Sequence, residues 1–425
     1  MRIWIFSLIL LSWFPGAFAE AAEDFNLSTE SNEELTVHVF PATFPDANKP
    51  LLVWFTEGYA DRSSFKHLIT QLNDEGYSLW QVDLLESYFL ERTPSNVRRL
   101  SGEGIAAVLQ HAQENGQPFV PISTGRMSLI LLRGARLWQL ADRPEKGYGG
   151  LQQVVLFFPN LYDAAEKAGD APQLFPIVSA SSLPVTLVQP GEGTYKWKTA
   201  DLQQALETHH SQVTIAGVPK VRDWYFLRRQ AEVNEVETKA SNALPAQLGM
   251  WLQVSRPEKN REFKPAQELV EAKVTERKKG LVPIPTRSAA AFELTDISGH
   301  AINLKEKQGK VVLLNFWASW CPPCVKEIPS MNRLAESFDA KRFEIVSVNF
   351  KESPKAVKDF LKQVQVDFPV LIDLDGKVAA DYEIFSFPSS FLIDAKGNLR
   401  YSVNAAIEWD DAEVKTVINQ LLNDK

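Results

Sequence analysis

The chain contains only two cysteines, Cys321 and Cys324, and two prolines separate them. Two cysteines at this spacing at the start of a helix fall on one turn, so their sulfurs can pair. The first sulfur would face the free N–H groups and the positive end of the helix dipole, which favours thiolate over thiol. Pro322 and Pro323 fit the first helical turn, where a missing N–H costs little. Cys324 would be more sheltered and act as the resolving thiol, so the pattern predicts thiol–disulfide exchange.

Four other uses of the cysteine pair compete with this interpretation. A structural disulfide would close a two-residue gap and constrain the unfolded chain very little. A zinc site needs two further ligands, and neither a second cysteine pair nor a suitably spaced histidine pair lies nearby. Haem attachment needs a histidine directly after Cys324, where Val325 stands. An inert surface pair is the last alternative, and the predicted strand before the motif and helix after it argue against it.

The elements that must position the cysteines follow an alternating strand and helix pattern. Apolar runs predict strands, and amphipathic stretches predict helices. The expected elements are strands at Val311–Trp317, Phe343–Asn349, Pro369–Ile372 and Ser390–Ile393, with helices from Cys321, over Ser353–Val364 and over Asp410–Leu422. The C-terminal third is therefore expected to be an α/β domain with the cysteines between its first long strand and the helix that follows.

The segment Val311–Glu327, which reads VVLLNFWASWCPPCVKE, resembles the active-site region of the thioredoxin superfamily in its exported TlpA/ResA-like branch. The resemblance covers roughly Ala290–Lys425 and includes Phe368–Asp373 and Phe387–Asp394. It implies a thioredoxin fold and a thiol–disulfide oxidoreductase that acts on protein disulfides. It also implies a reductase that receives electrons from a membrane thiol carrier and uses no cofactor or metal.

The resemblance also assigns roles around the cysteines. The family proline that matches Pro388 is cis and leaves the backbone of Phe387 free to pair with an incoming chain, with Trp320 on the rim of this docking site. The alternative is an ordinary edge-strand proline. Glu327 matches a glutamate that tunes the cysteine pKa values and relays protons, or it merely complements the helix dipole. Asn315 stands where many thioredoxins keep a buried aspartate, which shifts the acid–base role towards Glu327.

Two departures limit how far the resemblance reaches. Phe387, Ser389 and Ser390 differ from the residues common around the family proline, so the substrate preference stays open. A peroxiredoxin, the nearest relative to exclude, needs a threonine and a proline just before its reactive cysteine, and Ala318-Ser319-Trp320 offers no such threonine.

The N-terminal half also reads as α/β, with a mostly parallel sheet covered on both faces. Its expected strands are Pro50–Phe55, Leu79–Val82, Met127–Leu132, Gln153–Phe158, Val185–Val188 and Val213–Ile215, with helices such as Phe65–Glu75 and Ile105–Glu114. We therefore expect a doubly wound sheet, joined through a linker to the thioredoxin fold.

Leu51–Phe226 resembles the α/β-hydrolase fold more weakly, and its catalytic positions look empty. With the nucleophile elbow placed over Leu129–Ala135, Leu132 takes the position of the serine. Thr194 takes the place of the usual aspartate, with Glu192 as the nearby carboxylate, and Gly217–Phe226 contains no histidine. Ser128 is the one residual nucleophile candidate. We expect a domain that has lost catalysis and serves for binding or for positioning the redox domain.

The N-terminus and the composition indicate where the protein works. A lone Arg2, the apolar Ile3–Phe14 and the small-residue site Ala17–Ala19 predict a signal peptide cleaved after Ala19; a membrane anchor is the alternative. Because no cysteine lies near that site, a lipoprotein anchor is excluded, and a Gram-negative periplasm is expected. The net charge of −8 without a basic run argues against nucleic-acid binding. No later segment is apolar enough to span a membrane, so an integral membrane protein is not expected.

The expected organisation is a signal peptide over residues 1–19, a hydrolase-like domain over 20–228, a charged and partly helical linker over 229–289, and a thioredoxin-like domain over 290–425. The linker assignment rests on its charge and on Pro283 and Pro285. Two other functions compete with the oxidoreductase. One is a binding or scaffold protein whose dithiol senses redox state, and the other is a bifunctional hydrolase–oxidoreductase, which Leu132 disfavours.

Overall fold

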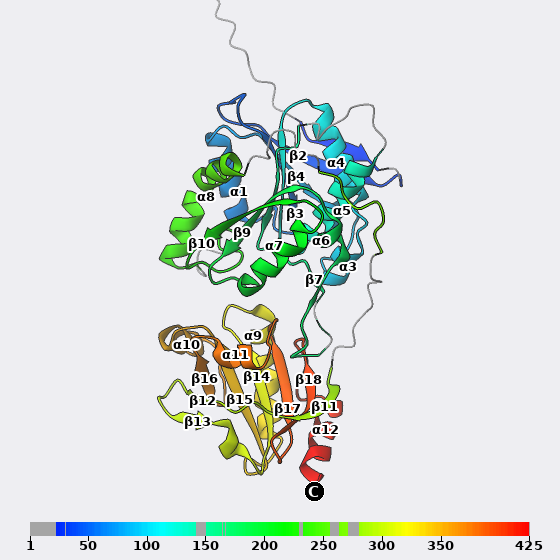
Figure 1. Ribbon diagram of the computed structural model, residues 1–425. Helices are drawn as coiled ribbons and strands as arrows, with labels where there is room; N and C mark the ends of the chain where they lie inside the picture. Colours follow the sequence, from blue (N-terminus) through cyan, green and yellow to red (C-terminus); the bar gives the residue numbers. More distant parts are fainter. Residues whose placement is uncertain are drawn as a thin grey trace, which may run out of the picture.

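The computed structural model describes residues 23–424, apart from Glu30, 142–149, Ala164, Glu166, 229–232, 256–262 and 271–279. The expected signal peptide and its cleavage site lie outside the described residues. Figure 1 shows two α/β units, one above the other, each built around its own sheet. In the described part of the chain, no helix is long and apolar enough to cross a membrane.

The N-terminal unit is built on an eight-stranded sheet in the order β1-β2-β4-β3-β5-β6-β9-β10. Its strands are β1 (Phe25–Ser28), β2 (Glu34–Phe40), β3 (Leu51–Thr56), β4 (Leu79–Asp83), β5 (Phe119–Thr124), β6 (Val154–Phe157), β9 (Pro184–Pro190) and β10 (Gln212–Val218). The pairs β1–β2 and β2–β4 are antiparallel, and all later pairs are parallel. Every residue of β3 and β5 is buried, as expected for central strands covered on both faces.

Helices cover both faces of this sheet and separate its core into two clusters. The helices are α1 (Ser63–Asp74), α2 (Leu84–Ser87), α3 (Pro94–Arg99), α4 (Glu103–Glu114), α5 (Met127–Leu140), α6 (Pro176–Ala180), α7 (Thr199–Glu207) and α8 (Glu235–Val254). Apolar residues of α1 and α8 share one cluster, and those of α4, α5, α6 and α7 share the other. A small hairpin, β7 (Tyr162–Asp163) with β8 (Gln173–Leu174), extends from this unit.

One expected strand is wrong. Met127–Leu132 begins helix α5, and the strand before it is β5, Phe119–Thr124. The helix α5 is buried over nearly its whole surface, so its sequence is an unbroken apolar run that resembles a buried strand. The true strand contains Pro121, which is unusual in a central strand and concealed it.

The expected linker over 229–289 also differs from the structure. The side chains of Leu244, Leu248 and Leu252 on α8 are buried against the N-terminal sheet, so this helix belongs to the first unit. A capping box between Asn234 and Glu237 begins it. The segment β11 (Val282–Ser288) pairs with β18 of the second sheet, where its prolines are tolerated because it is an edge strand.

The C-terminal unit has a six-stranded sheet in the order β11-β18-β17-β14-β15-β16. Its further elements are β12 (Glu293–Thr295), β13 (Ala301–Asn303), β14 (Val311–Trp317), β15 (Phe343–Phe350), β16 (Val370–Asp373), β17 (Ser389–Ile393), β18 (Asn398–Val403), α9 (Pro322–Glu336), α10 (Pro354–Leu361), α11 (Lys377–Asp381) and α12 (Ala412–Asn423). The strands β14, β15 and β16 run parallel, and β17 is antiparallel to β14. The expected thioredoxin-like fold is confirmed.

The loop between β7 and β8 connects the two units. It reaches from the upper unit down to the edge of the lower one in Figure 1. The Asn404 side chain donates a hydrogen bond to the backbone oxygen of Ala165 over 2.8 Å, and Ala168 is buried in a core cluster of the C-terminal unit. The N-terminal unit is therefore docked next to the loop that precedes β17.

Candidate active site

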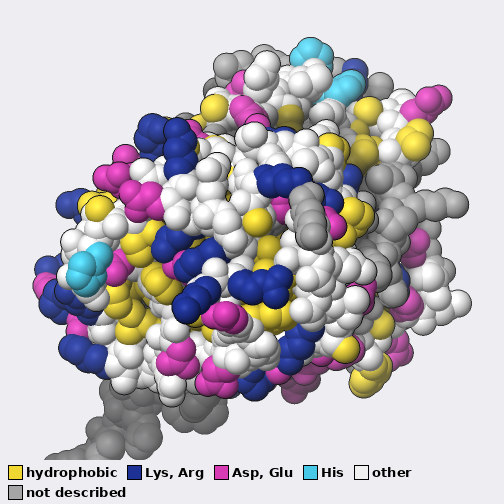
Figure 2. All heavy atoms as spheres, turned by 90° about the horizontal axis from the view of Figure 1, so that it is seen from below, with side chains coloured by type: hydrophobic (Ala, Val, Ile, Leu, Met, Phe, Trp, Pro, Cys, Tyr) yellow, Lys and Arg dark blue, Asp and Glu magenta, His cyan; other side chains and the backbone are white. Residues whose placement is uncertain are grey.

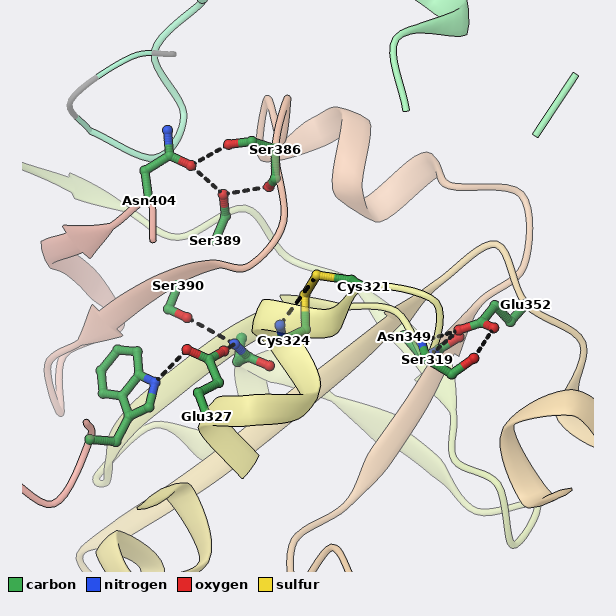
Figure 3. The surroundings of a disulfide bond; sticks show 12 residues. Ser319, Cys321, Cys324, Glu327, Asn349, Glu352, Ser386, Ser389, Ser390 and Asn404 are labelled. Atoms are coloured by element: carbon green, nitrogen blue, oxygen red, sulfur yellow. Dashed lines mark hydrogen bonds between the residues drawn. A yellow bond between two sulfur atoms is a disulfide. The ribbon is translucent and has the colours of Figure 1, made fainter. Parts of the chain in front are cut away.

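The cysteine pair lies where β14 leads into α9. The strand β14 ends at Trp317, and Cys321 is the N-cap residue of α9. The two cysteines form a disulfide in this structure, and the backbone N–H of Cys324 donates to the Cys321 sulfur over 3.3 Å (Figure 3). Cys321 is 5% exposed and Cys324 is 1% exposed, so the expected asymmetry has the right direction but is small. The geometry places the Cys321 sulfur against the N-terminal N–H groups of the helix, which favour a thiolate.

A carboxylate holds the loop that precedes Cys321. Glu352 accepts hydrogen bonds from the backbone N–H of Ser319 at 2.7 Å, from the Ser319 hydroxyl, and from the Asn349 amide at 2.8 Å. Figure 3 shows these three side chains together on one side of the disulfide. The sequence reasoning missed Glu352, because only the parallel pairing of β14 with β15 brings their ends together.

Glu327 lies within the interior of the unit. Its side chain is one turn along α9 from Cys324 and only 2% of the residue is exposed. One carboxylate oxygen accepts from the Asn315 amide at 3.0 Å, and the other accepts from the Trp409 indole N–H at 3.1 Å. Burial raises the pKa of Glu327 to about 8, although the two hydrogen bonds act in the opposite direction. An exposed charge at the start of a helix does not fit these contacts, whereas a group that gains and loses a proton near neutral pH does.

The network around Glu327 includes residues that the sequence reasoning did not assign to it. The Asn315 amide also donates to the Ser390 hydroxyl at 2.9 Å, and the backbone N–H of Trp409 donates to the Ser330 hydroxyl. Trp409 is fully buried. Its distance of 82 positions from Glu327 along the chain left no local signal that could have paired the two.

The Pro388 loop lies beside the cysteines, as expected. The Phe387–Pro388 peptide bond is cis. Ser389 begins β17 and pairs with Phe316 near the end of β14, which places the loop next to the turn that carries Cys321. The Ser389 hydroxyl donates to the backbone oxygen of Ser386 at 2.8 Å, and the Ser386 hydroxyl bonds to the Asn404 side chain (Figure 3).

Three aromatic rings surround the cysteines on this side. The Trp320 and Phe387 rings meet edge to face with centroids 5.8 Å apart, and the Phe387 and Phe350 centroids are 4.8 Å apart. Of these three, the sequence reasoning named Trp320 and Phe387 and missed Phe350. Together they form an apolar rim, here called the aromatic rim, over which an incoming chain must pass.

Candidate sites in the N-terminal unit look different. The turn from β5 to α5 is at Gly125 and Arg126, so the elbow expected over Leu129–Ala135 is misplaced, and Leu132 is buried within the helix. Gly125 has a φ of 53°, and a Cβ atom built there would lie 2.9 Å from the Trp224 ring. The sharp turn therefore carries no side chain, and an indole covers it.

The other expected hydrolase positions are occupied by structural contacts. Ser128 is fully buried and its hydroxyl accepts a hydrogen bond from the Ser123 hydroxyl over 3.1 Å. The backbone N–H of Thr194 donates to the Asp223 carboxylate at 2.9 Å. Burial raises the pKa of Asp223. Among the described residues, no group of three or more His, Cys, Asp or Glu side chains could hold a metal ion.

Comparisons with known proteins agree on the C-terminal unit. Residues 285–402 match the AhpC/TSA family. The chain is 43% identical over 113 residues to the thiol-disulfide oxidoreductase ResA of Bacillus thuringiensis subsp. konkukian, and this match covers 27% of the chain and 65% of that protein. It is 36% identical over 126 residues to ResA of Geobacillus kaustophilus, covering 30% of the chain and 72% of that protein. The chain thus spans just under two thirds of the first of these relatives.

One solved structure is similar over the same share of the chain. It is a thiol:disulfide interchange protein of the thioredoxin family from Chlorobium tepidum, 25% identical, and the match covers 33% of this chain and 99% of that one with a TM-score of 0.29.

Proposed function

This chain belongs, through residues 285–402, to the AhpC/TSA family, and we propose that it is a thiol–disulfide oxidoreductase that acts through Cys321 and Cys324. The observation that carries the proposal is the position of the Cys321 sulfur at the N-cap of α9, where it accepts the N–H of Cys324. Relatives named ResA are thiol-disulfide oxidoreductases.

The reaction proceeds in two exchange steps. The Cys321 thiolate attacks a substrate disulfide, one substrate sulfur leaves as a thiolate that takes up a proton, and a mixed disulfide forms. Cys324 then loses its proton and attacks the Cys321 sulfur, which releases the second substrate thiol and leaves the Cys321–Cys324 disulfide. The substrate gains two electrons and two protons, and the protein loses them.

Glu327 is the proton acceptor for Cys324 in this scheme. A free cysteine has a pKa of about 8.5, so a carboxylate with a pKa of about 8 is well matched to take its proton. Asn315 and Trp409 hold the two carboxylate oxygens and so fix the direction in which the group accepts. Pro388, Phe387 and Trp320 form the docking surface for the substrate chain.

The proposed location is the periplasm, and the proposed direction is reduction, with electrons supplied by a membrane thiol carrier. The signal-like sequence before Glu20 supports export, and an exported compartment already supplies oxidants. The test of direction is the reduction potential of the Cys321–Cys324 couple, measured in glutathione or dithiothreitol redox buffers. A potential near that of thioredoxin, about −270 mV, supports a reductase, and one near that of DsbA, about −120 mV, contradicts it.

For the N-terminal unit, we propose an α/β-hydrolase-like domain without catalysis that positions substrates for the dithiol. Its mostly parallel eight-stranded sheet and the sharp turn at Gly125 support the hydrolase-like assignment. The competing function, a scaffold whose dithiol only senses redox state, is separated by turnover: an enzyme reduces many equivalents of a disulfide when it is supplied with reductant, and a sensor reacts once.

A further inference from the structure

A cavity of about 220 Å³ lies between the two units, beside the aromatic rim. The N-terminal unit contributes residues that follow the carboxyl ends of β9 and β10, including Lys196 and Lys220. The C-terminal unit contributes Trp320 and Phe350–Glu352. Because Trp320 directly precedes Cys321, a chain that reaches the attacking sulfur from this side passes through the cavity.

Contacts on the neighbouring side of the Pro388 loop keep the two units at this spacing. In addition to the hydrogen bond between Asn404 and Ala165, the Lys198 ammonium lies 5.1 Å from the centre of the Phe385 ring. These contacts involve residues on both sides of Phe387 in sequence, while Trp320 and Phe350 still line the cavity. The N-terminal unit thereby forms the second wall of a cleft whose first wall is the dithiol face.

The charge of the cavity wall is positive. Four cations line it, namely Lys196, Lys220, Arg222 and Lys351, against two carboxylates, Glu192 and Glu352. Both carboxylates are engaged within the protein: Glu352 accepts from Ser319 and Asn349, and Glu192 lies 3.5 Å from the Lys196 ammonium. An excess of cations in a cleft attracts anionic partners and raises their association rate.

The volume also limits the occupant. Pockets for small molecules usually measure about 300–1,000 Å³, so a cavity of 220 Å³ suits one or two side chains of a chain that lies across it. We propose that this cleft binds an extended, acidic polypeptide segment that carries the target disulfide. The inference rests on the proposed function, which it extends by naming the substrate class and by giving the N-terminal unit a role in selecting it.

A second basic region provides a matched control. Figure 2 shows the end of the C-terminal unit that faces away from the N-terminal unit, where Lys and Arg side chains gather near the middle. Lys341 follows the C-terminal end of α9, the end opposite to the dithiol, and is exposed like Lys220. Reversing its charge changes the net charge of the protein as much as reversing that of Lys220 but leaves the cleft intact.

The test compares two synthetic peptides of equal length, each with one internal disulfide, flanked by glutamates in one and by lysines in the other. The reduced full-length protein is mixed with each peptide under single-turnover conditions. We expect the acidic peptide to be reduced about tenfold faster at low salt, and this ratio to fall as salt screens the charges. Lys220→Glu should cut the ratio to about a third or less, and Lys341→Glu should leave it unchanged.

A second variant guards against misfolding. Lys220 has a φ of 60°, which asparagine tolerates, so Lys220→Asn removes the charge in a residue type suited to that backbone. Its thermal unfolding should match that of the unmodified protein, with a smaller fall in the peptide ratio. Equal rates for both peptides, or equal effects of Lys220→Glu and Lys341→Glu, would overturn the acidic-substrate cleft but leave the oxidoreductase standing. Failure to reduce either peptide would overturn the proposed function itself.

Discussion

The same local architecture occurs once in each unit, and it serves different ends. In the N-terminal unit, the buried strand β5 turns through Gly125 and Arg126 into α5; in the C-terminal unit, the buried strand β14 turns through Ala318–Trp320 into α9. Both turns present a helix N-terminus at the edge of a sheet. One carries Cys321, and the other carries a glycine covered by Trp224. A strand, a tight turn and a helix therefore provide a position, and the side chain on the turn decides whether chemistry occurs there.

The surroundings of the two turns reinforce the difference. Next to Cys321 lies Glu327, a buried carboxylate whose pKa of about 8 suits proton transfer near neutral pH. Next to Gly125 the polar groups are engaged with each other: Ser123 donates to Ser128, and Asp223 accepts from Thr194. The predictions below test this contrast.

The largest effect is expected at the turn of the C-terminal unit. Cys321→Ser removes the attacking sulfur and should lower the rate of disulfide reduction by at least about 10³-fold, because no other group on the chain can form the mixed disulfide. Ser128→Ala, at the corresponding helix of the N-terminal unit, should leave the rate unchanged. Turnover of a fluorescent cystine peptide with excess reductant measures both. A comparable loss in Ser128→Ala would remove the contrast between the units.

The next effect concerns Glu327. Because the pKa of this carboxyl is raised to about 8, it is protonated at pH 6 and becomes a base only as pH rises through about 8. The rate of the resolving step should therefore rise over that range. Glu327→Gln should lose this rise and slow the step by about 10²-fold above pH 8. The exposed Glu336→Gln on the same helix serves as the control, and equal pH profiles for the two variants would contradict the role of Glu327.

Trp409 is expected to have a smaller effect through Glu327. Trp409→Phe removes an N–H donor that stabilises the ionised carboxylate, so the midpoint of the pH profile should move upward by about 1 unit. Trp138→Phe, which removes an equally buried indole of the N-terminal unit, should leave the midpoint in place. A slower rate without a shifted midpoint would reduce Trp409 to a packing residue.

No effect is expected from the hydrolase-like turn. Acyl transfer needs a nucleophile and an activating base, and Gly125 provides no side chain for the first of these. The full-length protein should neither hydrolyse short-chain nitrophenyl esters nor react with a serine-directed fluorophosphonate. Labelling that disappears in Ser128→Ala would show that the N-terminal unit is an enzyme as well.

The sequence predicted the C-terminal unit well because its signals are local. Cys321 and Cys324 lie on one helical turn, and the Pro388 loop is a contiguous motif. The misses depend on distant pairing: Glu352 meets Ser319 only after β14 and β15 align, and Trp409 meets Glu327 only when the C-terminal segment folds back.

In the N-terminal unit the misses have a different cause. Burial erased the periodicity of α5, so that it read as a strand, and Pro121 concealed β5. The placement of the elbow at Leu132 followed from that single error.

The central claim, that the N-terminus of α9 makes Cys321 the attacking thiol, is tested most directly by the thiolate pKa of each cysteine. The reduced full-length protein is pulsed with iodoacetamide from pH 4 to 10, and mass spectrometry measures alkylation of Cys321 and Cys324 separately. We expect Cys321 to react with a pKa below about 7.5, within the range found at helix N-termini, and Cys324 to stay unreactive until well above it. Equal titration of the two cysteines near 8.5, or faster alkylation of Cys324, would contradict the account.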